Sequence, residues 1–291
     1  MIDPNILKKN SLGFWEVAKR PSEKELNEHY SGKYYQNPRG TYQKTYSKDD
    51  LAYFTNRSSV AHFIAKKFGV HGGSVIDLGC GEGFLSSHFQ KQGYDVTCCD
   101  FSKFGVSQFN PDLLPSFREG DIFKIIDQEI SDRNSFDLVF LENVLEHVLH
   151  PQDLLASLRE IMTSNSIARI TVPNDFSAFQ SALVEAGLTK VTWVSEIEHL
   201  SYFNAQSLVS ISEASGFEVL SLQADFPIEQ FMSNPHANYW QDRSLGKGAH
   251  QARVFCTNYL IERDIGAFVQ YAEAAARLEF GRAISIYLRR N

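Results

Sequence analysis

The sequence predicts a doubly wound α/β fold, in which a mostly parallel sheet is covered by helices on both faces. Short apolar runs alternate with segments of helical periodicity over residues 74–172. The runs are continuously apolar, as parallel strands buried on both faces are. The chain has 291 residues, of which 43% are hydrophobic and 22% charged. This ordinary globular composition excludes wholesale disorder.

The elements of the expected sheet follow one another in a regular order. Residues 49–69 carry apolar side chains at helical spacing and end at Gly69, which predicts a helix before the first strand. Five strands are expected at 74–78, 95–99, 116–119, 136–141 and 167–172. Helices are expected between them at 84–92, 104–110, 122–130 and 151–162. Connections of this kind are right-handed crossovers.

The remainder of the chain adds segments outside this pattern. A helix is expected at 205–215, a strand at 217–222, a loop over 223–248, helices near 249–262 and 265–279, and a last strand at 282–288. We therefore expect three parts. They are a polar, tyrosine-rich N-terminal segment (1–50), a core (51–222), and a loop and helical insertion that ends in the final strand (223–291).

Charge and cysteine usage narrow the functional class. Lys and Arg number 28 against 35 Asp and Glu, a formal net charge of −7, which argues against nucleic-acid backbones as partners. No apolar run has the length of a membrane helix, and the N-terminus lacks the apolar core of a signal peptide. The four cysteines form no C-x-x-C pair. We expect a reduced, cytoplasmic protein.

A glycine-rich turn follows the first strand of the sheet. It reads VIDLGCGEGF and contains Asp77, Gly79, Cys80, Gly81 and Gly83. Glycines let the backbone approach a ligand closely, and a helix N-terminus stands behind them. The third glycine comes one residue earlier than in the dinucleotide fingerprint, which disfavours an NAD-dependent oxidoreductase. An acidic residue in the loop mouth suits a cationic ligand group, although the motif alone is also compatible with a tight turn.

Two more acidic residues follow neighbouring strands. Asp100, with Phe101 after it, lies about 20 residues beyond Gly79, the distance at which an acid accepts hydrogen bonds from ribose hydroxyls. Asp121 and its apolar neighbour Ile122 follow the third strand, where they can hold an adenine. Asp121 is equally suited to cap the next helix. Ligands of such sheets bind at the carboxyl ends of the strands, where all these residues are expected.

These motifs resemble class I S-adenosylmethionine-dependent methyltransferases over roughly residues 70–222. The resemblance continues through FDLVFLENVLEHVLHP, ITVPN and EHLSYFNAQSLVSISEASGF. These three pieces are similar to the branch of ubiquinone-type O-methyltransferases and of sugar and antibiotic methyltransferases. The resemblance implies a seven-stranded, Rossmann-like sheet whose last strand, 282–288, is antiparallel and lies beside 217–222. It also implies S-adenosylmethionine as cofactor, with Asp77 and the glycines around its methionine part, Asp100 on the ribose and Asp121 near the adenine.

A first group of candidate catalytic residues follows the fourth strand. Glu142 is expected to face the methyl side of the cofactor, and His147 is the second candidate for a base. In ubiquinone-type and small-RNA methyltransferases an E-x-x-E-H motif at this place binds a divalent metal. Aligning that motif on Glu146 and His147 puts Asn143 at the first ligand position, so we expect no metal. Glu146 and His147 can instead have a structural role, orienting the next helix.

A second group lies between the fifth strand and the next helix. His199 stands in the segment where this family inserts part of its acceptor pocket, and it is the first candidate for the base that removes a hydroxyl proton. A structural role for this imidazole is the alternative. Asn174 and Asp175 follow the fifth strand and are expected to line the acceptor site.

We therefore expect a methyltransferase whose acceptor is a hydroxyl of a sugar, glycan precursor or secondary metabolite. An N- or C-methyltransferase acting on a similar metabolite is the alternative, and a non-catalytic cofactor-binding protein is a third hypothesis. The Pro-Pro-aromatic motif of DNA amino-methyltransferases is absent after the fourth strand, which argues against nucleic acid, and no membrane partner is expected. Residues 1–50 are expected to form a lid, and the aromatics of 223–281 a core, an acceptor pocket or a homodimer surface.

Overall fold

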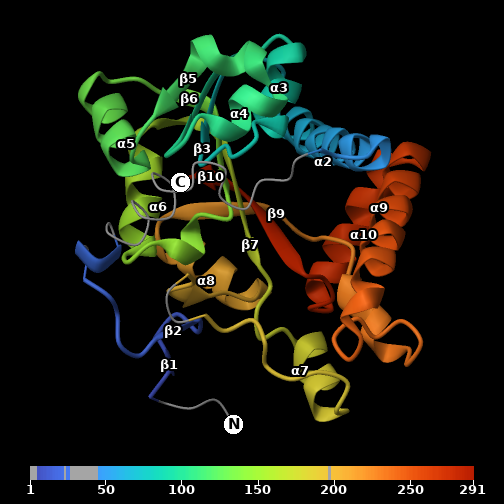
Figure 1. The fold of residues 1–291 in the computed structure, drawn as a ribbon. Coiled ribbons are helices and arrows are strands. Elements are labelled where there is room, and N and C mark those ends of the chain that lie inside the picture. Colours follow the sequence, from blue (N-terminus) through green and yellow to red (C-terminus); the bar gives the residue numbers. More distant parts are fainter. Residues whose placement is uncertain (1–4, 23, 27–44, 196–197) are drawn as a thin grey trace.

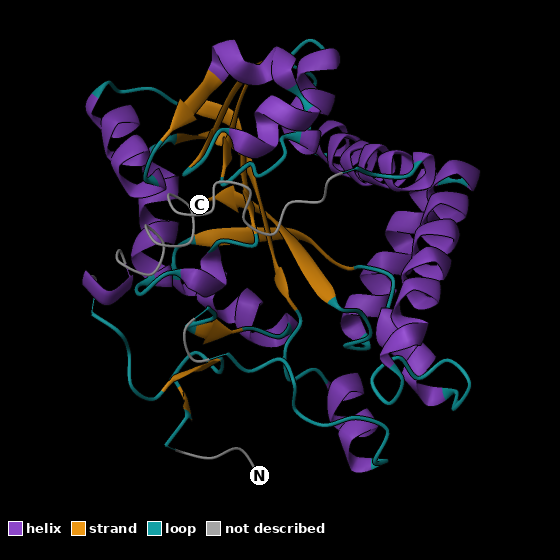
Figure 2. Cartoon of the chain, in the orientation of Figure 1, coloured by secondary structure: helices purple, strands orange, loops and turns teal. Residues whose placement is uncertain are grey.

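A seven-stranded sheet forms the centre of the molecule (Figures 1 and 2). The structure is a computed structural model that describes residues 5–22, 24–26, 45–195 and 198–291. The sheet order is β5-β4-β3-β6-β7-β10-β9. The strands are β3 (Ser74–Leu78), β4 (Asp95–Asp100), β5 (Phe117–Glu119), β6 (Phe136–Glu142), β7 (Met162–Pro173), β9 (Phe217–Ala224) and β10 (Ala283–Arg290).

The last strand, β10, is antiparallel to both of its neighbours, as the sequence predicts. It lies between β7 and β9, and Ile286 is paired with Ile170 on one side and with Leu222 on the other. Ile284, Ile286 and Leu288 have no exposed surface. β10 therefore fills an interior position of the sheet, next to the edge strand β9, and its apolar side chains belong to the hydrophobic core.

Helices cover both faces of the sheet, and Figure 1 shows them as two groups on either side of the strands. One face carries α5 (Ile122–Ser131), α6 (Pro151–Glu160) and α8 (Ala205–Ala214). The other carries α2 (Lys48–Lys67), α3 (Phe84–Lys91), α4 (Phe104–Phe109) and α9 (Gly246–Arg263), while α10 (Ile265–Arg277) packs along β9. The core is buried between these layers because β3, β4, β6, β7 and β10 present apolar side chains to both faces.

Several short elements were not expected from the sequence. A small antiparallel sheet joins β1 (Leu7–Lys9), β2 (Trp15–Val17) and β8 (Ser201–Tyr202), and α7 (Ala178–Glu185) follows β7. Strands of two or three residues are too short to show a period in the sequence. Four short 3-10 helices complete the described elements, at η1 (Pro111–Ser116), η2 (Leu145–His147), η3 (Ile228–Ser233) and η4 (Arg243–Leu245).

The two segments outside the core are only partly as expected. The N-terminal segment pairs with β8 through β2, but residues 27–44, where four of its five expected lid tyrosines stand, lie outside the described residues. The expected loop of 223–248 contains η3 and η4, and α9 begins at Gly246. Across the described part of the chain, every helix is either too short or too polar to span a bilayer.

The burial of β10 between β7 and β9 yields a stability prediction. Replacing Ile286 by alanine should lower the free energy of unfolding by about 2–5 kcal/mol, because it removes buried methyl groups and leaves a cavity. Phe255→Ala is the matched control, since Phe255 on α9 is 72% exposed and surface substitutions change stability by at most about 0.5 kcal/mol. Urea unfolding followed by circular dichroism measures both. Equal effects would show that β10 is not part of the cooperative core.

Candidate functional site

The glycine-rich turn after β3 is bent tightly against the neighbouring strands. The backbone N–H groups of Gly79 and Cys80 both donate to the carbonyl of Cys99 in β4, at 2.8 and 2.9 Å. Gly79, Gly81 and Gly83 all have positive φ, at 81°, 56° and 75°. A Cβ on Gly79 would lie 2.6 Å from Val144 Cγ2, whereas a Cβ on Gly81 would meet nothing within 4 Å. The turn is thus packed on one side and open at Gly81, where a ligand can contact its backbone.

Asp100 and Asp77 lie beside this turn, as predicted. The carboxylate of Asp100 accepts hydrogen bonds from the N–H groups of Gly81 at 2.9 Å and Ser102 at 3.3 Å. Asp77 is 2% exposed and accepts a hydrogen bond of 2.6 Å from the hydroxyl of Ser86 on α3. Burial raises the pKa of Asp77 to about 6, against the lowering effect of the Ser86 bond. A cationic ligand group near Asp77 would favour its charged form.

The residues at the third strand have a visible local role. Asp121 is the N-cap of α5, and its side chain accepts a hydrogen bond of 2.9 Å from the N–H of Phe123. The helix-capping alternative is therefore observed, while contact of Asp121 with an adenine stays a prediction. Ile122 is buried. Cys80, within the glycine-rich turn, and Phe101, directly after β4, are both half-buried.

Tyr46 connects the N-terminal segment to the glycine-rich turn, a contact that the sequence did not reveal. Its hydroxyl donates to the carboxylate of Glu82, with O···O distances of 2.7 and 2.8 Å. Its ring packs against the rings of Phe54, Phe84 and Phe109. Of the five tyrosines assigned to a lid, Tyr46 is the one that the structure describes, and it lies against the expected cofactor loop.

Glu142, the expected methyl-side residue, ends β6 and pairs with a buried arginine. Its carboxylate binds the guanidinium of Arg169 on β7, which is 5% exposed and packs near the ring of Tyr287. Arg169 was not singled out from the sequence. The available signal is its charge within the otherwise apolar run Ile167 to Val172, because a charged residue inside a buried strand requires a partner.

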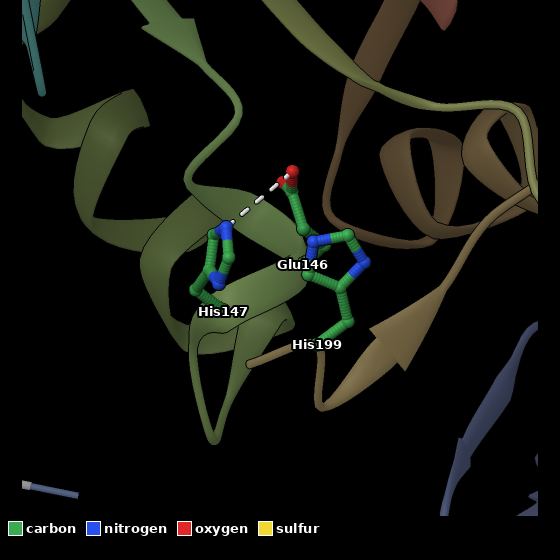
Figure 3. A group of neighbouring side chains, drawn as sticks. All are labelled: Glu146, His147 and His199. Carbon is green, nitrogen blue, oxygen red and sulfur yellow. Dashed lines mark ion pairs between the residues drawn. The ribbon is translucent and has the colours of Figure 1, made fainter. Parts of the chain in front are cut away.

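The two candidate bases, His147 and His199, lie together with Glu146 (Figure 3). One ligand atom from each of the three lies within 4.8 Å of the others. The two imidazole rings meet edge to face, with centroids 4.8 Å apart. His147 Nε2 is 3.7 Å from Glu146 Oε1, and the opposite ring nitrogen contacts the carbonyl of Glu198. Residues 52 positions apart in the sequence thus form one cluster.

Glu146 is the buried member of this cluster, with 1% of its surface exposed. Neither carboxylate oxygen accepts a hydrogen bond from a described residue. Burial, together with the nearby charge of Asp175, raises the pKa of Glu146 to about 8. Glu146 is therefore mostly protonated at neutral pH unless a cation binds beside it.

Asp175 lies on the other side of His199. Its Oδ2 is 4.0 Å from His199 Nδ1, and its Oδ1 accepts a hydrogen bond of 2.9 Å from Arg282. Burial raises the pKa of Asp175, while the Arg282 guanidinium opposes that rise. Arg282 was expected only as the start of the last strand. The sequence placed Asp175 at the acceptor site, but its link to His199 depends on how β7 and β8 come together.

The backbone fixes the two halves of the cluster to each other. The N–H of Leu200 donates to the carbonyl of Glu146 at 2.8 Å, and the N–H of Asp175 donates to the carbonyl of Phe203 at 2.8 Å. The segment around β8 is therefore attached to the ends of β6 and β7, at the same edge of the sheet as the glycine-rich turn. An open backbone loop with two acids and a pair of imidazoles can bind a ligand and move a proton beside it.

Comparisons with known proteins agree with this arrangement. A family model described as a methyltransferase domain matches residues 53–222, more than half of the chain. The chain is 25% identical over 159 residues to a ubiquinone biosynthesis O-methyltransferase of Idiomarina loihiensis, covering 53% of this chain and 65% of that protein. It is 24% identical over 164 residues to the protein of that name from Aromatoleum aromaticum, covering 55% and 70%. The chain thus spans about two thirds of the length of these relatives.

Solved structures show the same fold. The magnesium protoporphyrin IX methyltransferase of Synechocystis PCC 6803, with bound S-adenosylhomocysteine, gives a TM-score of 0.52 at 14% identity over 93% of this chain and 100% of that one. A methyltransferase from Archaeoglobus fulgidus gives 0.51 at 15% identity over 90% and 98%. The fold, the glycine-rich turn with its two acids, and the family match agree. The chain belongs to the class I S-adenosylmethionine-dependent methyltransferases, and S-adenosylmethionine is its cofactor.

Proposed function

We propose that this methyltransferase acts on a hydroxyl group of a small molecule such as a sugar, a glycan precursor or a secondary metabolite. The observation that carries the proposal is the position of His199 between Asp175 and the Glu146–His147 pair. An imidazole held beside a buried carboxylate is suited to remove a hydroxyl proton. The names of the relatives from Idiomarina loihiensis and Aromatoleum aromaticum, which are O-methyltransferases, support this assignment.

The residues around the glycine-rich turn fit the cofactor. Gly81 leaves open space for a ligand, and Asp77 is a buried carboxylate that would gain from a nearby ammonium group. We assign Asp77, Gly79, Cys80, Gly81 and Gly83 to the methionine part. We assign Asp100 and Phe101 to the ribose side, Asp121 and Ile122 to the adenine, and Glu142 to the methyl side. The bound cofactor supplies an activated methyl group with its leaving group.

The base is assigned to His199, with His147 as the second candidate. Nδ1 of His199 faces Asp175, so Nε2 is the atom that we assign to the acceptor proton. When the ring takes up a proton, the Asp175 carboxylate stabilises the resulting positive charge, and Arg282 fixes the orientation of that carboxylate. His147 is in contact with the carbonyl of Glu198, which orients its ring.

A metal ion is the second explanation of the same cluster. One carboxylate and two imidazoles can hold a divalent cation, and the unbonded oxygens of Glu146 fit such a role. A cation there would bind Glu146, His147 and His199 and would polarise an acceptor oxygen. We propose metal-independent transfer, because Asn143 stands where the family motif has its first ligand carboxylate.

An N- or C-methyltransferase acting on a similar metabolite is the alternative. An amine acceptor can be methylated without a protein base, so the loss of both histidines would then leave the rate intact. The net charge of −7 favours a small molecule over nucleic acid. A homodimer surface formed by the aromatics of 223–281 stays a prediction, and Phe255 and Tyr259 of α9 are exposed in this region.

The assignment of Asp100 predicts a change in cofactor affinity. Asp100→Ala should weaken binding of S-adenosylmethionine by about 1–3 kcal/mol, because charged hydrogen bonds to the ribose are lost. Titration calorimetry measures the effect, and Asp127→Ala, which removes an exposed acid on α5, is the control. Unchanged affinity in a folded Asp100→Ala variant would contradict the ribose assignment.

The assignment of His199 predicts a change in rate. His199→Ala should lower kcat by roughly 10²–10⁴-fold for a hydroxyl acceptor, because a positioned base contributes about that factor. Affinity for S-adenosylmethionine should stay nearly constant, because the cofactor is assigned to the glycine-rich turn. His147→Ala is the paired variant. Near-normal kcat in His199→Ala would make the residue structural, and normal rates in both variants would favour an amine acceptor.

Chelation separates the base from the metal explanation. Treatment with EDTA should leave methyl transfer intact, because Glu146, His147 and His199 act without a cation in the proposed mechanism. The rate is measured with labelled S-adenosylmethionine before and after chelation, and again after Mg²⁺ or Mn²⁺ is added. A metal site would be established instead if EDTA removes the activity, if either ion restores it in the wild type, and if neither ion restores it in Glu146→Gln.

A further inference from the structure

A small cavity with both polar and apolar side chains in its lining lies away from the histidine cluster, on the sheet face covered by α2 and α9. Its volume is about 40 Å³, roughly the room of three water molecules. Side chains of β7, β9 and β10 form its floor, and residues of α2, α9 and α10 form its walls. Figure 1 shows α2, α9 and α10 gathered on this side of the sheet.

Three arginines converge at or near this cavity. Arg57 of α2 and Arg169 of β7 line it directly. The guanidinium of Arg57 lies 5.6 Å from the centre of the Tyr53 ring, and that of Arg253 on α9 lies 5.5 Å from the same centre. Arg253 also contacts His250 Nδ1 at 3.0 Å. The single aromatic ring therefore brings two guanidinium groups from different helices close together.

The carboxylates of this region do not form close ion pairs with both helical arginines. Within the described residues, no carboxylate oxygen comes within 4.0 Å of Arg57 or Arg253. The acid of the cavity wall, Asp225, uses one oxygen to accept two backbone N–H groups, from Arg282 and Ala283, at 2.8 Å each. Burial raises the pKa of Asp225, and the positive charges of Arg57 and Arg253 both oppose that rise. This one acid thus faces two helical arginines. Because buried cations are costly unless they are paired, the excess positive charge of the cavity favours an added anion.

Unsatisfied donors point to the same conclusion. Thr257 is 3% exposed, and its hydroxyl lacks a hydrogen-bond partner among the described residues. The Nε–H of Arg169 is likewise buried without an acceptor in the described part of the chain. Both residues line the cavity. Buried donors are nearly always bonded in proteins, and an oxyanion in the cavity would provide acceptors for these groups.

Two short chains of contacts connect the cavity with the proposed active site. Arg169 reaches Glu142 at the end of β6, on the assigned methyl side. Asp225 binds the backbone of Arg282, whose guanidinium holds Asp175 beside His199. The cavity and the histidine cluster are therefore built on the same ends of β6, β7 and β10.

We propose that the cavity binds an anionic group of the methyl acceptor, a carboxylate or a phosphate, between Arg57 and Arg169. The proposal rests on the proposed function and specifies its substrate class as acidic small molecules. Planar guanidinium groups bind carboxylate and phosphate through paired hydrogen bonds. The Thr257 hydroxyl and the Arg169 Nε–H donate further bonds to the same group.

The first test measures anion binding without catalysis. Acetate and inorganic phosphate are titrated against the full chain, with chloride at equal ionic strength as reference, and the shift in thermal unfolding temperature is recorded. We expect one of the two oxyanions to stabilise the wild type, and Arg57→Gln to weaken its apparent affinity roughly 10- to 100-fold, as for a lost charged hydrogen bond. The preferred ion shows whether the group is a carboxylate or a phosphate.

Two variants keep the result interpretable. Arg277→Gln removes an exposed arginine on α10 and should leave anion binding unchanged. Thr257→Val keeps the shape of the side chain but removes the unbonded hydroxyl, and it should weaken anion binding even where Arg57→Gln does not fold. Equal behaviour of acetate, phosphate and chloride, or equal affinity in wild type, Arg57→Gln and Thr257→Val, would overturn the proposal.

The second test uses matched acceptors. Hydroxy acids and their neutral amides are compared in a labelled methyl-transfer assay, and Arg57→Gln should raise KM for the acids roughly 10- to 100-fold while leaving KM for the amides unchanged. Equal KM for acids and amides in the wild type would overturn the anionic-substrate proposal and leave the methyltransferase assignment standing. Anion binding without transfer to any hydroxyl acceptor would support the cavity and overturn O-methylation.

Discussion

The close approach of the glycine-rich turn to β4 and β6 is the constraint on which the site depends. Gly79 donates to Cys99 and leaves no room for a Cβ beside Val144. Val144 directly precedes η2, so the same contact fixes the position of η2 and with it Glu146 and His147. The next glycine, Gly81, binds the carboxylate of Asp100. A side chain at Gly79 would therefore disturb Asp100 and the histidine cluster together, because the same turn of backbone positions both.

The cost of burying ionisable groups is concentrated at the carboxyl edge of the sheet. Asp175 is stabilised there by Arg282, and Glu142 by Arg169, so each of these carboxylates has a cation. Glu146 has no such partner among the described arginines and lysines, and its raised pKa follows from that difference. Apolar residues at such buried positions would often make the folded state equally or more stable. The presence of these carboxylates is consistent with the rule that perturbed ionisable groups gather at functional sites.

Sequence reasoning predicted the layered core well because most of its strands are largely apolar runs. It misjudged β7, which begins at Met162 rather than at 167, because the residues in between are polar and show no strand period. The contact between His147 and His199 depends on the pairing of Leu200 with Glu146. No local pattern encodes such a long-range hydrogen bond. Asp121 shows a different difficulty. An aspartate at this position can cap a helix or bind a ligand, and the sequence pattern is the same for both roles.

The identity of the acceptor cannot be inferred from the relatives, because much of the region proposed to contact it lies outside the matched domain. The family match ends at residue 222, whereas Asp225, Thr257 and Arg282 come after it. The C-terminal insertion is attached to α2 through a hydrogen bond from Asn56 to Asn258 at 3.0 Å and through the Asp50–His250 contact at 3.1 Å. The walls around the arginine cavity are thus built by joining the N-terminal helix to this insertion. Cofactor chemistry follows from the shared core, whereas the proposed selection of an acidic acceptor depends on the added segments.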